Sequence, residues 1–188
     1  MRTIGMLSIS FLFLACGGSQ QKDAAAAGAA MAASAPGAVA TLEPRSGSNV
    51  AGTATFTAAG NGQVAVMVKV ANAAPGKHGV HLHLTGDCSA PDAASAGGHF
   101  NPENMQHGGP DGATHHAGDL GNIDVGADGT GTLNVTTKDL TLTDGPHSVI
   151  GRAVVVHEKV DDLVTQPTGN SGARQACGVI AAAPNPAK

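Results

Sequence analysis

Valine occupies every second position from residue 64 to residue 70, in the stretch VAVMVKV, and the dipeptide Asn61-Gly62 stands just before it. Because alternate side chains of a β-strand point to the same face, this spacing predicts a half-buried strand. The preceding stretch, residues 49–60, is also rich in β-forming residues, and Asn-Gly between two such stretches is a strong signal for a tight hairpin. Antiparallel strands joined by short turns are therefore the units from which this chain is expected to fold.

Short β-rich stretches continue through the rest of the chain, and no long helical period interrupts them. A second hairpin is predicted within residues 119–137, with its turn at Ala127-Asp128-Gly129. Further strands are predicted over residues 39–44, 76–84, 147–159 and 176–182. About eight short strands separated by turns are typical of an all-β fold, an antiparallel sandwich or barrel.

Two long segments without periodicity separate these strands, residues 85–115 and residues 161–175. A connection as long as the first is either functional or disordered when it occurs in a compact domain. It contains His99, His107 and His115, so a functional loop is the favoured interpretation.

The first 38 residues differ in composition from the rest. Arg2 precedes an apolar run over residues 4–14 that is too short to span a bilayer, so residues 1–15 are predicted to be an export signal peptide. Cys16 follows a small residue at the end of that run and resembles the lipidated first residue of a bacterial lipoprotein; the alternative is an ordinary signal peptide cleaved nearby. Residues 16–38 would form a flexible, Ala/Gly-rich tether, and residues 39–188 the exported domain.

Export is expected under both alternatives, to the cell envelope or periplasm. Gly17 replaces the aspartate that favours inner-membrane retention, so a lipid on Cys16 is expected to anchor the protein to the outer membrane, with no other membrane attachment. The chain carries a net charge of −4 and no basic block, which argues against nucleic acid as a partner.

The chain has three cysteines. If Cys16 carries lipid, Cys88 and Cys177 remain as an even pair in an oxidising compartment, where disulfides persist. Their bridge would close a loop of roughly 90 residues and stabilise the fold by about 4 to 5 kcal/mol in the chain-entropy model. The alternative is two free, buried thiols.

Histidines are concentrated in the strands and in the first long loop. In HGVHLHL, residues 78–84, His81 and His83 share one face of a predicted strand; taken alone, they could be polar residues on its solvent side. Three imidazoles and one carboxylate suit tetrahedral zinc, and the loop offers His99, His107, His116 and Asp119. An all-imidazole set suits copper, and the strands offer His81, His83 and His157, with His99 as a shared fourth ligand.

Six motifs in order, HGVHLH, GGHFNP, HGGPDG, HHAGDLGN, IGRAVVVHEKVDD and GNSGARQACGVI, make residues 39–183 resemble copper/zinc superoxide dismutase. The resemblance implies an eight-stranded antiparallel Greek-key β-barrel with two long functional loops, and one copper ion and one zinc ion per subunit. It implies that copper is bound by His81, His83, His99 and His157, and zinc by His99, His107, His116 and Asp119. His99 would then bridge the two metals, whereas His78, His115 and His147 are not expected to be ligands.

The same resemblance assigns roles to four further residues. Asp161 would link a copper ligand to a zinc ligand, and such outer partners fix the orientation and tautomer of an imidazole. Arg174 would receive the anionic substrate beside the copper. Cys88 and Cys177 would form a disulfide within the subunit that anchors the first long loop.

The implied activity is the dismutation of superoxide to dioxygen and hydrogen peroxide by alternating Cu(II) and Cu(I). His99 would pass a proton to the product, and Arg174, with Lys159, would attract the anion to a protein of negative net charge. Only LVTQP separates Asp162 from Thr168, a short, uncharged segment where many eukaryotic relatives have a longer, charged one, so weaker electrostatic steering is expected.

Two other functions, and the state of assembly, remain open at this stage. A non-catalytic copper-binding or copper-delivery module could use the same scaffold, but it would be expected to lack a copper ligand or the arginine. A purely structural surface lipoprotein would bind neither metal and leaves the histidine spacing unexplained. A homodimer is favoured over a monomer.

Overall fold

The computed structural model describes residues 37–184. The predicted signal peptide, Cys16 and nearly all of the predicted tether lie outside the described residues. Within residues 37–184, no helix is long and apolar enough to cross a membrane. The regular elements are one short 3-10 turn, η1 (Ala94–Ala96), and the strands β1 (Ala38–Pro44), β2 (Ala51–Gly60), β3 (Gln63–Ala71), β4 (Gly76–His83), β5 (Asp119–Val125), β6 (Gly131–Thr137), β7 (Ala153–His157), β8 (Arg174–Val179) and β9 (Ala181–Ala182).

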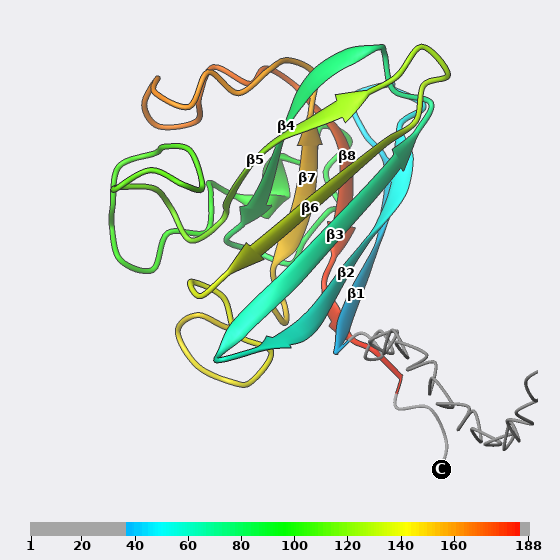
Figure 1. The fold of residues 1–188 in the computed structure, drawn as a ribbon. Coiled ribbons are helices and arrows are strands. Elements are labelled where there is room, and N and C mark those ends of the chain that lie inside the picture. The colour runs from blue at the N-terminus through cyan, green and yellow to red at the C-terminus, as the bar shows by residue number, and fades with distance from the viewer. Residues whose placement is uncertain (1–36, 185–188) are drawn as a thin grey trace, which may run out of the picture. The chain divides into compact units, whose positions relative to one another are not determined.

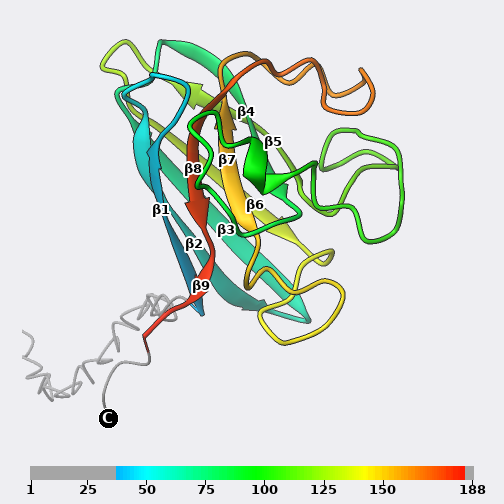
Figure 2. The same cartoon turned by 180° about the vertical axis from the view of Figure 1, so that it is seen from behind.

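The strands form a closed antiparallel barrel (Figures 1 and 2). Their order around the sheet is β2-β3-β6-β5-β4-β7-β8-β1, and β1 pairs with β2 to complete the circle, while the short β9 adds to β1. The pairs β3–β6 and β4–β7 join strands that are not neighbours in the sequence. The predicted eight-stranded Greek-key barrel is thereby confirmed, with one additional strand.

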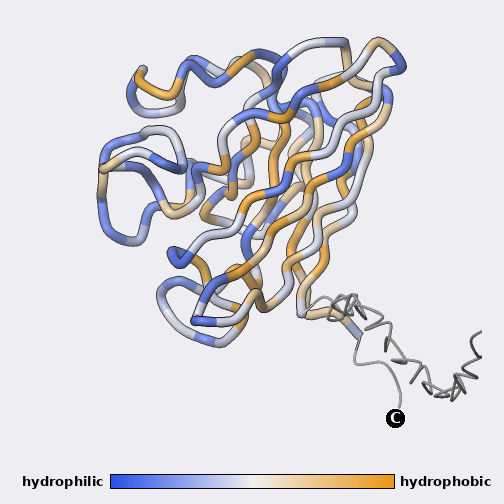
Figure 3. Tube along the Cα trace, in the orientation of Figure 1, coloured by the Kyte–Doolittle hydropathy of each residue, from blue (hydrophilic) through white to orange (hydrophobic). Residues whose placement is uncertain are grey.

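The valine alternation places the core. Val64, Val66, Val68 and Val70 are all buried in β3, whereas Met67 and Lys69 between them are exposed. Asn61 and Gly62 both adopt positive φ, as the tight hairpin turn between β2 and β3 requires. Apolar and polar residues alternate along the barrel strands in Figure 3, as expected for strands with one face on a core and one in water.

The predicted strand boundaries differ from the structure most clearly at the starts of β7 and β8. β7 begins at Ala153 rather than residue 147, because the Arg152 amide donates to the Val149 carbonyl in a turn that includes Gly151 at φ 76°. β8 begins at Arg174 rather than residue 176, because Arg174 still pairs with His157 across a bulge. The second difference places the candidate residue Arg174 at the start of a strand.

Two long connections leave the barrel on one side, residues 84–118 between β4 and β5 and residues 158–173 between β7 and β8. Figures 1 and 2 show them projecting together beyond the strands. Hydrogen bonds join them directly, at His107 to Gln166 and His107 to Asp161. The predicted loops therefore build one substructure over the side of the barrel.

Candidate metal centre

Both faces of β4 are buried at its carboxyl end. Val80 and Leu82 point into the barrel core, while His81 and His83 on the opposite face are only 0% and 1% exposed. The interpretation of these histidines as solvent-side residues is therefore wrong, because the two long loops cover that face. Leu84, just beyond the strand, is 49% exposed.

Four imidazoles converge over this covered face. His157 ends β7, beside β4, and its Nε2 lies 3.4 Å from Nε2 of His83. His99 forms an isolated β-bridge with His83, and its ring stacks on that of His81 with centroids 3.9 Å apart. One ring nitrogen from each residue can be chosen so that all lie within 4.8 Å of one another: His81, His83, His99 and His157. The structure thus brings together the four predicted copper ligands.

The predicted zinc ligands adjoin this group through His99. Asp119, at the start of β5, has Oδ1 2.9 Å from His99 Nδ1 and Oδ2 3.0 Å from His107 Nδ1. His116 Nδ1 lies 3.3 Å from Asp119 Oδ1 and 3.4 Å from His99 Nδ1. The mutually close set in this half of the centre nevertheless contains His81 in place of His116: His81, His99, His107 and Asp119.

Several ring nitrogens at the centre are left free for a cation. His81 Nδ1, His99 Nε2 and His107 Nδ1 are buried without a hydrogen-bond partner, although buried polar atoms in proteins are nearly always paired. His107 Nδ1 is close to Asp119 but not in hydrogen-bonding geometry. Imidazole nitrogens, together with a carboxylate oxygen, are atoms that bind copper and zinc in proteins.

At His83 and His157, a hydrogen bond from the outer ring nitrogen sets the tautomer of the imidazole. His83 Nδ1–H donates to the Gly97 carbonyl at 2.8 Å, and His157 Nδ1–H donates to the Gly172 carbonyl at 3.3 Å. In both residues the unprotonated Nε2, the atom able to bind a metal, therefore faces the centre. This is the arrangement by which outer partners orient metal-binding histidines.

Asp161 connects the two halves of the centre. Its Oδ2 accepts from His81 Nε2–H at 2.8 Å, and its Oδ1 accepts from His107 Nε2–H at 2.9 Å. Its backbone is held in turn by the Asn122 side chain, which accepts from the Asp161 N–H at 2.7 Å and donates to its carbonyl at 2.9 Å. A Cβ added at Gly169 would overlap Asp161 Oδ1, so only glycine leaves room for this carboxylate.

Burial and charge set the protonation of the centre. Burial lowers the pKa of His81 to about 4, against the opposing effect of Asp161, and lowers the pKa values of His83 and His157 well below the ordinary value. Burial also acts to lower the pKa of His107, but the Asp119 and Asp161 carboxylates outweigh it and raise that pKa to about 9. The neutral imidazole, the form that binds metal, therefore prevails at His81, His83 and His157.

The two carboxylates are held in the ionised form. Burial acts to raise the pKa of Asp119, but its contacts with His107 and His99 outweigh burial and hold the pKa well below the usual range. The pKa of Asp161 is likewise lowered, because hydrogen bonds from His107 and His81 outweigh the effect of burial. An ionised Asp119 is the form that can bind zinc.

Arg174 lies beside the four imidazoles, at the start of β8. Its Nη1 donates to the Ala93 carbonyl at 2.6 Å and its Nη2 to the Gly97 carbonyl at 2.7 Å. Burial lowers the pKa of Arg174, but an arginine stays cationic at neutral pH. The guanidinium is thus a fixed positive charge next to the centre.

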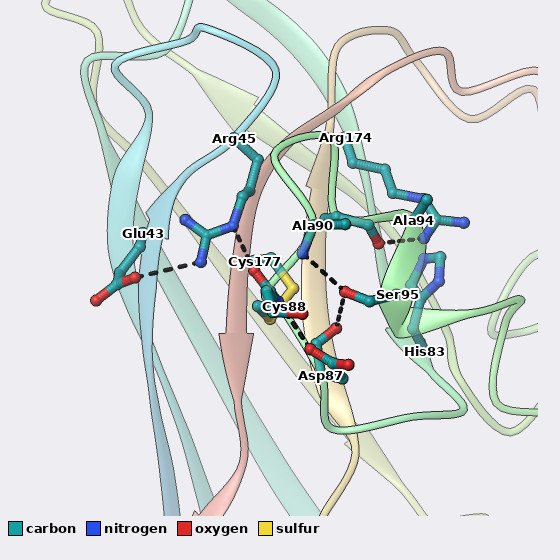
Figure 4. The surroundings of a disulfide bond; sticks show 12 residues. Glu43, Arg45, His83, Asp87, Cys88, Ala90, Ala94, Ser95, Arg174 and Cys177 are labelled. Atoms are coloured by element: carbon teal, nitrogen blue, oxygen red, sulfur yellow. Dashed lines mark hydrogen bonds and ion pairs between the residues drawn. A yellow bond between two sulfur atoms is a disulfide. The ribbon is translucent and has the colours of Figure 1, made fainter.

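The predicted disulfide between Cys88 and Cys177 is present and ties the first long loop to β8 (Figure 4). Arg45 and Arg174 lie to either side of it in this view. Arg45 Nε donates to the Cys88 carbonyl at 2.8 Å, and the neighbouring Ser46 amide donates to Pro91. The loop is therefore held from both sides as well as by the covalent bond.

Three histidines lie outside both groups of candidate ligands. His78 is buried with its ring nitrogens facing the His157 and Ala74 carbonyls. His115 pairs with Asp139, and His147 pairs with Glu103. None of them belongs to the two candidate ligand groups found among residues 37–184.

Several residues that organise the centre were not predicted from the sequence. Gly97, Asn122, Gln166 and Arg45 act through backbone hydrogen bonds. Asn122 stands within the HHAGDLGN motif, which could have drawn attention to it. Gln166 and Arg45 carry no sequence signal, since their partners become neighbours only in the folded loops.

A closed antiparallel barrel whose loops cover a buried, histidine-rich centre defines a class of all-β protein able to hold metal ions. Residues 50–180 match the family model described as copper/zinc superoxide dismutase (SODC). A solved structure titled "Crystal Structure Analysis of the clock protein EA4" is similar at a TM-score of 0.71 and 39% identity, over 79% of this chain and 96% of that one. The chain belongs to the copper/zinc superoxide dismutase family.

Proposed function

We propose that this protein is an enzyme that dismutates superoxide to dioxygen and hydrogen peroxide. The observation that carries the proposal is the set of four buried imidazoles, His81, His83, His99 and His157, with the Arg174 guanidinium beside them. A protein that only stores copper would need the four imidazoles but not the fixed Arg174 guanidinium beside them.

The residues fit two ions of different character. His81, His83, His99 and His157 would hold copper, and His99, His107, His116 and Asp119 would hold zinc. When bound, copper supplies the one-electron redox chemistry of the reaction, whereas zinc has no redox chemistry and contributes structure and charge. Asp161, bonded to His81 and His107, would keep both sets in register.

Arg174 has the task of binding the substrate anion. Its two hydrogen bonds to the Ala93 and Gly97 carbonyls fix the guanidinium before substrate arrives, so that little side-chain entropy is lost on binding. The remaining N–H groups of its planar fork are available to superoxide. Because the chain has a net charge of −4, this local cation has to supply the attraction.

His99 has the task of holding a proton near the bound anion. Its Nε2 is buried without a hydrogen-bond partner, on the ring that also faces Asp119 through Nδ1 at 2.9 Å. Product peroxide needs two protons, and His99 Nε2 would be positioned to supply one of them in the part of the cycle in which it holds a proton instead of binding metal.

The β7–β8 loop would contribute little to attracting the anion, because its exposed side chains Leu163 and Val164 carry no charge.

The deciding experiment measures superoxide loss by protein reconstituted with copper and zinc. Rapid, catalytic loss that disappears when copper is removed supports the proposal. Protein that retains copper but does not accelerate superoxide loss would instead be a non-catalytic copper-binding or copper-delivery module.

Cell location and assembly are proposed from the sequence. We expect export to the periplasm with a lipid on Cys16 and attachment to the outer membrane, and a homodimer. Labelling of the wild-type protein but not of Cys16→Ser by a radioactive fatty acid would support the anchor, and sedimentation of the metal-loaded domain would give its mass.

A further inference from the structure

Gln166, in the β7–β8 loop, binds the backbone of His107 with both ends of its side-chain amide. Gln166 Oε1 accepts from the His107 N–H at 2.8 Å, and Gln166 Nε2 donates to the His107 carbonyl at 2.9 Å. One side chain thus satisfies both main-chain polar groups of a predicted zinc ligand, in the way that a neighbouring strand would.

His107 has no other main-chain support of this kind. It lies outside the strands, and within residues 37–184 no main-chain hydrogen bond reaches its N–H or carbonyl group. Its ring is held by the donation of Nε2–H to Asp161 Oδ1 at 2.9 Å. Both supports of His107 therefore come from one connection, the β7–β8 loop.

Hydrogen bonds within the β7–β8 loop hold the segment from which the Gln166 side chain reaches His107. Asp162 accepts from the Val164 and Thr165 amides at 3.0 and 2.8 Å and from the Thr165 hydroxyl at 2.6 Å. The Asp162 amide donates to Gly169 across the loop at 2.9 Å. These bonds close the LVTQP segment into a small folded unit. Gln166 itself is exposed to solvent, so the barrel core does not depend on it.

We propose that Gln166 is a positioning residue for the zinc ligand His107, an inference that rests on the metal centre proposed above. With the backbone held by Gln166 and ring Nε2 by Asp161, buried His107 Nδ1 is directed at Asp119 Oδ2, 3.0 Å away, in the half of the centre proposed for zinc. Pre-orientation of a ligand lowers the entropy cost of binding. Loss of such outer partners typically weakens metal binding about 10- to 100-fold.

The test compares Gln166→Met, which at similar volume removes the two hydrogen bonds to His107 and the bond from Gln166 Nε2 to the Val164 carbonyl, with Thr165→Val as matched control. The control removes only the Thr165 hydroxyl bond to Asp162; the two amide bonds to Asp162 that shape the segment, and all contacts with His107, remain. We expect zinc affinity, measured by chelator competition, to fall about tenfold in Gln166→Met and to be unchanged in Thr165→Val. The d–d absorption of cobalt placed in the zinc site should change only in Gln166→Met, and copper affinity should remain that of the wild type.

A second measurement needs no metal and detects a purely structural effect. Amide hydrogen exchange of the metal-free protein should show faster exchange at His107 in Gln166→Met than in the wild type, with the barrel strands unchanged. Wild-type zinc affinity and cobalt spectrum in Gln166→Met would overturn the inference, as would unchanged exchange at His107. In contrast, a wild-type protein that takes up neither zinc nor cobalt would overturn the proposed metal centre itself.

Discussion

His83 and Arg174 donate to the same acceptor, the carbonyl oxygen of Gly97, at 2.8 and 2.7 Å. One peptide group in the first long loop therefore orients both a predicted copper ligand and the predicted substrate-binding cation. The same loop carries Cys88, which is bonded to Cys177 in β8. The first long loop thus links the Cys88–Cys177 disulfide to the positions of both Arg174 and the His83 imidazole.

Arg174→Met should slow superoxide dismutation while leaving copper bound. The substitution removes the cation and both hydrogen bonds to the loop, and local electrostatic focusing is worth about tenfold or more in association rate. Pulse radiolysis would measure the rate, and elemental analysis the copper content. In the wild type, the rate should fall as salt is added at constant pH. A variant as fast as the wild type would contradict the proposed role of Arg174 in binding the substrate.

His157→Ala should abolish activity while leaving zinc content and fold largely intact. His157 contributes the Nε2 that lies 3.4 Å from Nε2 of His83, and it makes no contact with Asp119. The measurements are turnover, copper and zinc content, and circular dichroism. Unchanged turnover would show that His157 is not a ligand. Loss of zinc would show that the zinc site depends on the copper ligands.

Asp119→Ala should weaken zinc binding and loosen the first long loop. Asp119 lies within 3.3 Å of His99, His107 and His116, and its Oδ2 also accepts from the His116 and Gly108 amides at 2.8 and 3.1 Å. Zinc affinity should fall by at least about 10-fold, the lower end of the range for outer partners. Zinc content equal to that of the wild type after dialysis against a chelator would contradict this role.

Protein stripped of metal by chelation should be most stable near neutral pH. The pKa of His81 is lowered from 6.5 to about 4, so the unfolded state binds more protons in this window and stability falls as pH drops from 6.5 to 4. The pKa of His107 is raised to about 9, so its contribution is complete below pH 6.5 and is lost as pH rises through 9. Each shift corresponds to roughly 3 kcal/mol.

Thermal unfolding of the stripped protein between pH 4 and pH 9 would check this expectation. The melting temperature should pass through a maximum between about pH 6 and pH 7. The Asp161 carboxylate, whose pKa is held below its ordinary value, adds a further loss below about pH 4, since its contribution is present only above that range. A melting temperature independent of pH would contradict the described protonation of the centre.

The hairpins were predictable because their signal is local, whereas the Greek-key barrel, which joins strands distant in sequence, was implied by the family motifs. Valines at alternate positions of β3 and the Asn61-Gly62 turn specify a hairpin from adjacent residues alone, and both are in place. The beginning of β7 was not predictable, since residues 147–152 have strand-like composition but close a turn through Val149 and Arg152. Only the pairing with β8 decides where β7 starts.

The candidate site was predictable in its residue types but not in its support. Histidine spacing and the family motifs identified the imidazoles and Asp119, which the fold brings together. The contributions of Gln166, Arg45 and the Gly97 carbonyl depend on contacts between loops that are distant in sequence. The closeness of His81 to the zinc-side residues likewise arises from the stacking of its ring on His99.

In the proposed metal centre, the imidazole of His99 lies between two cations. A crystal structure of copper- and zinc-loaded protein, with anomalous data at both absorption edges, tests it directly. We expect one copper peak near His81, His83, His99 and His157, and one zinc peak near His99, His107, His116 and Asp119, with the His99 ring between the two peaks. A single metal peak, or two peaks that do not both contact the His99 ring, would contradict it.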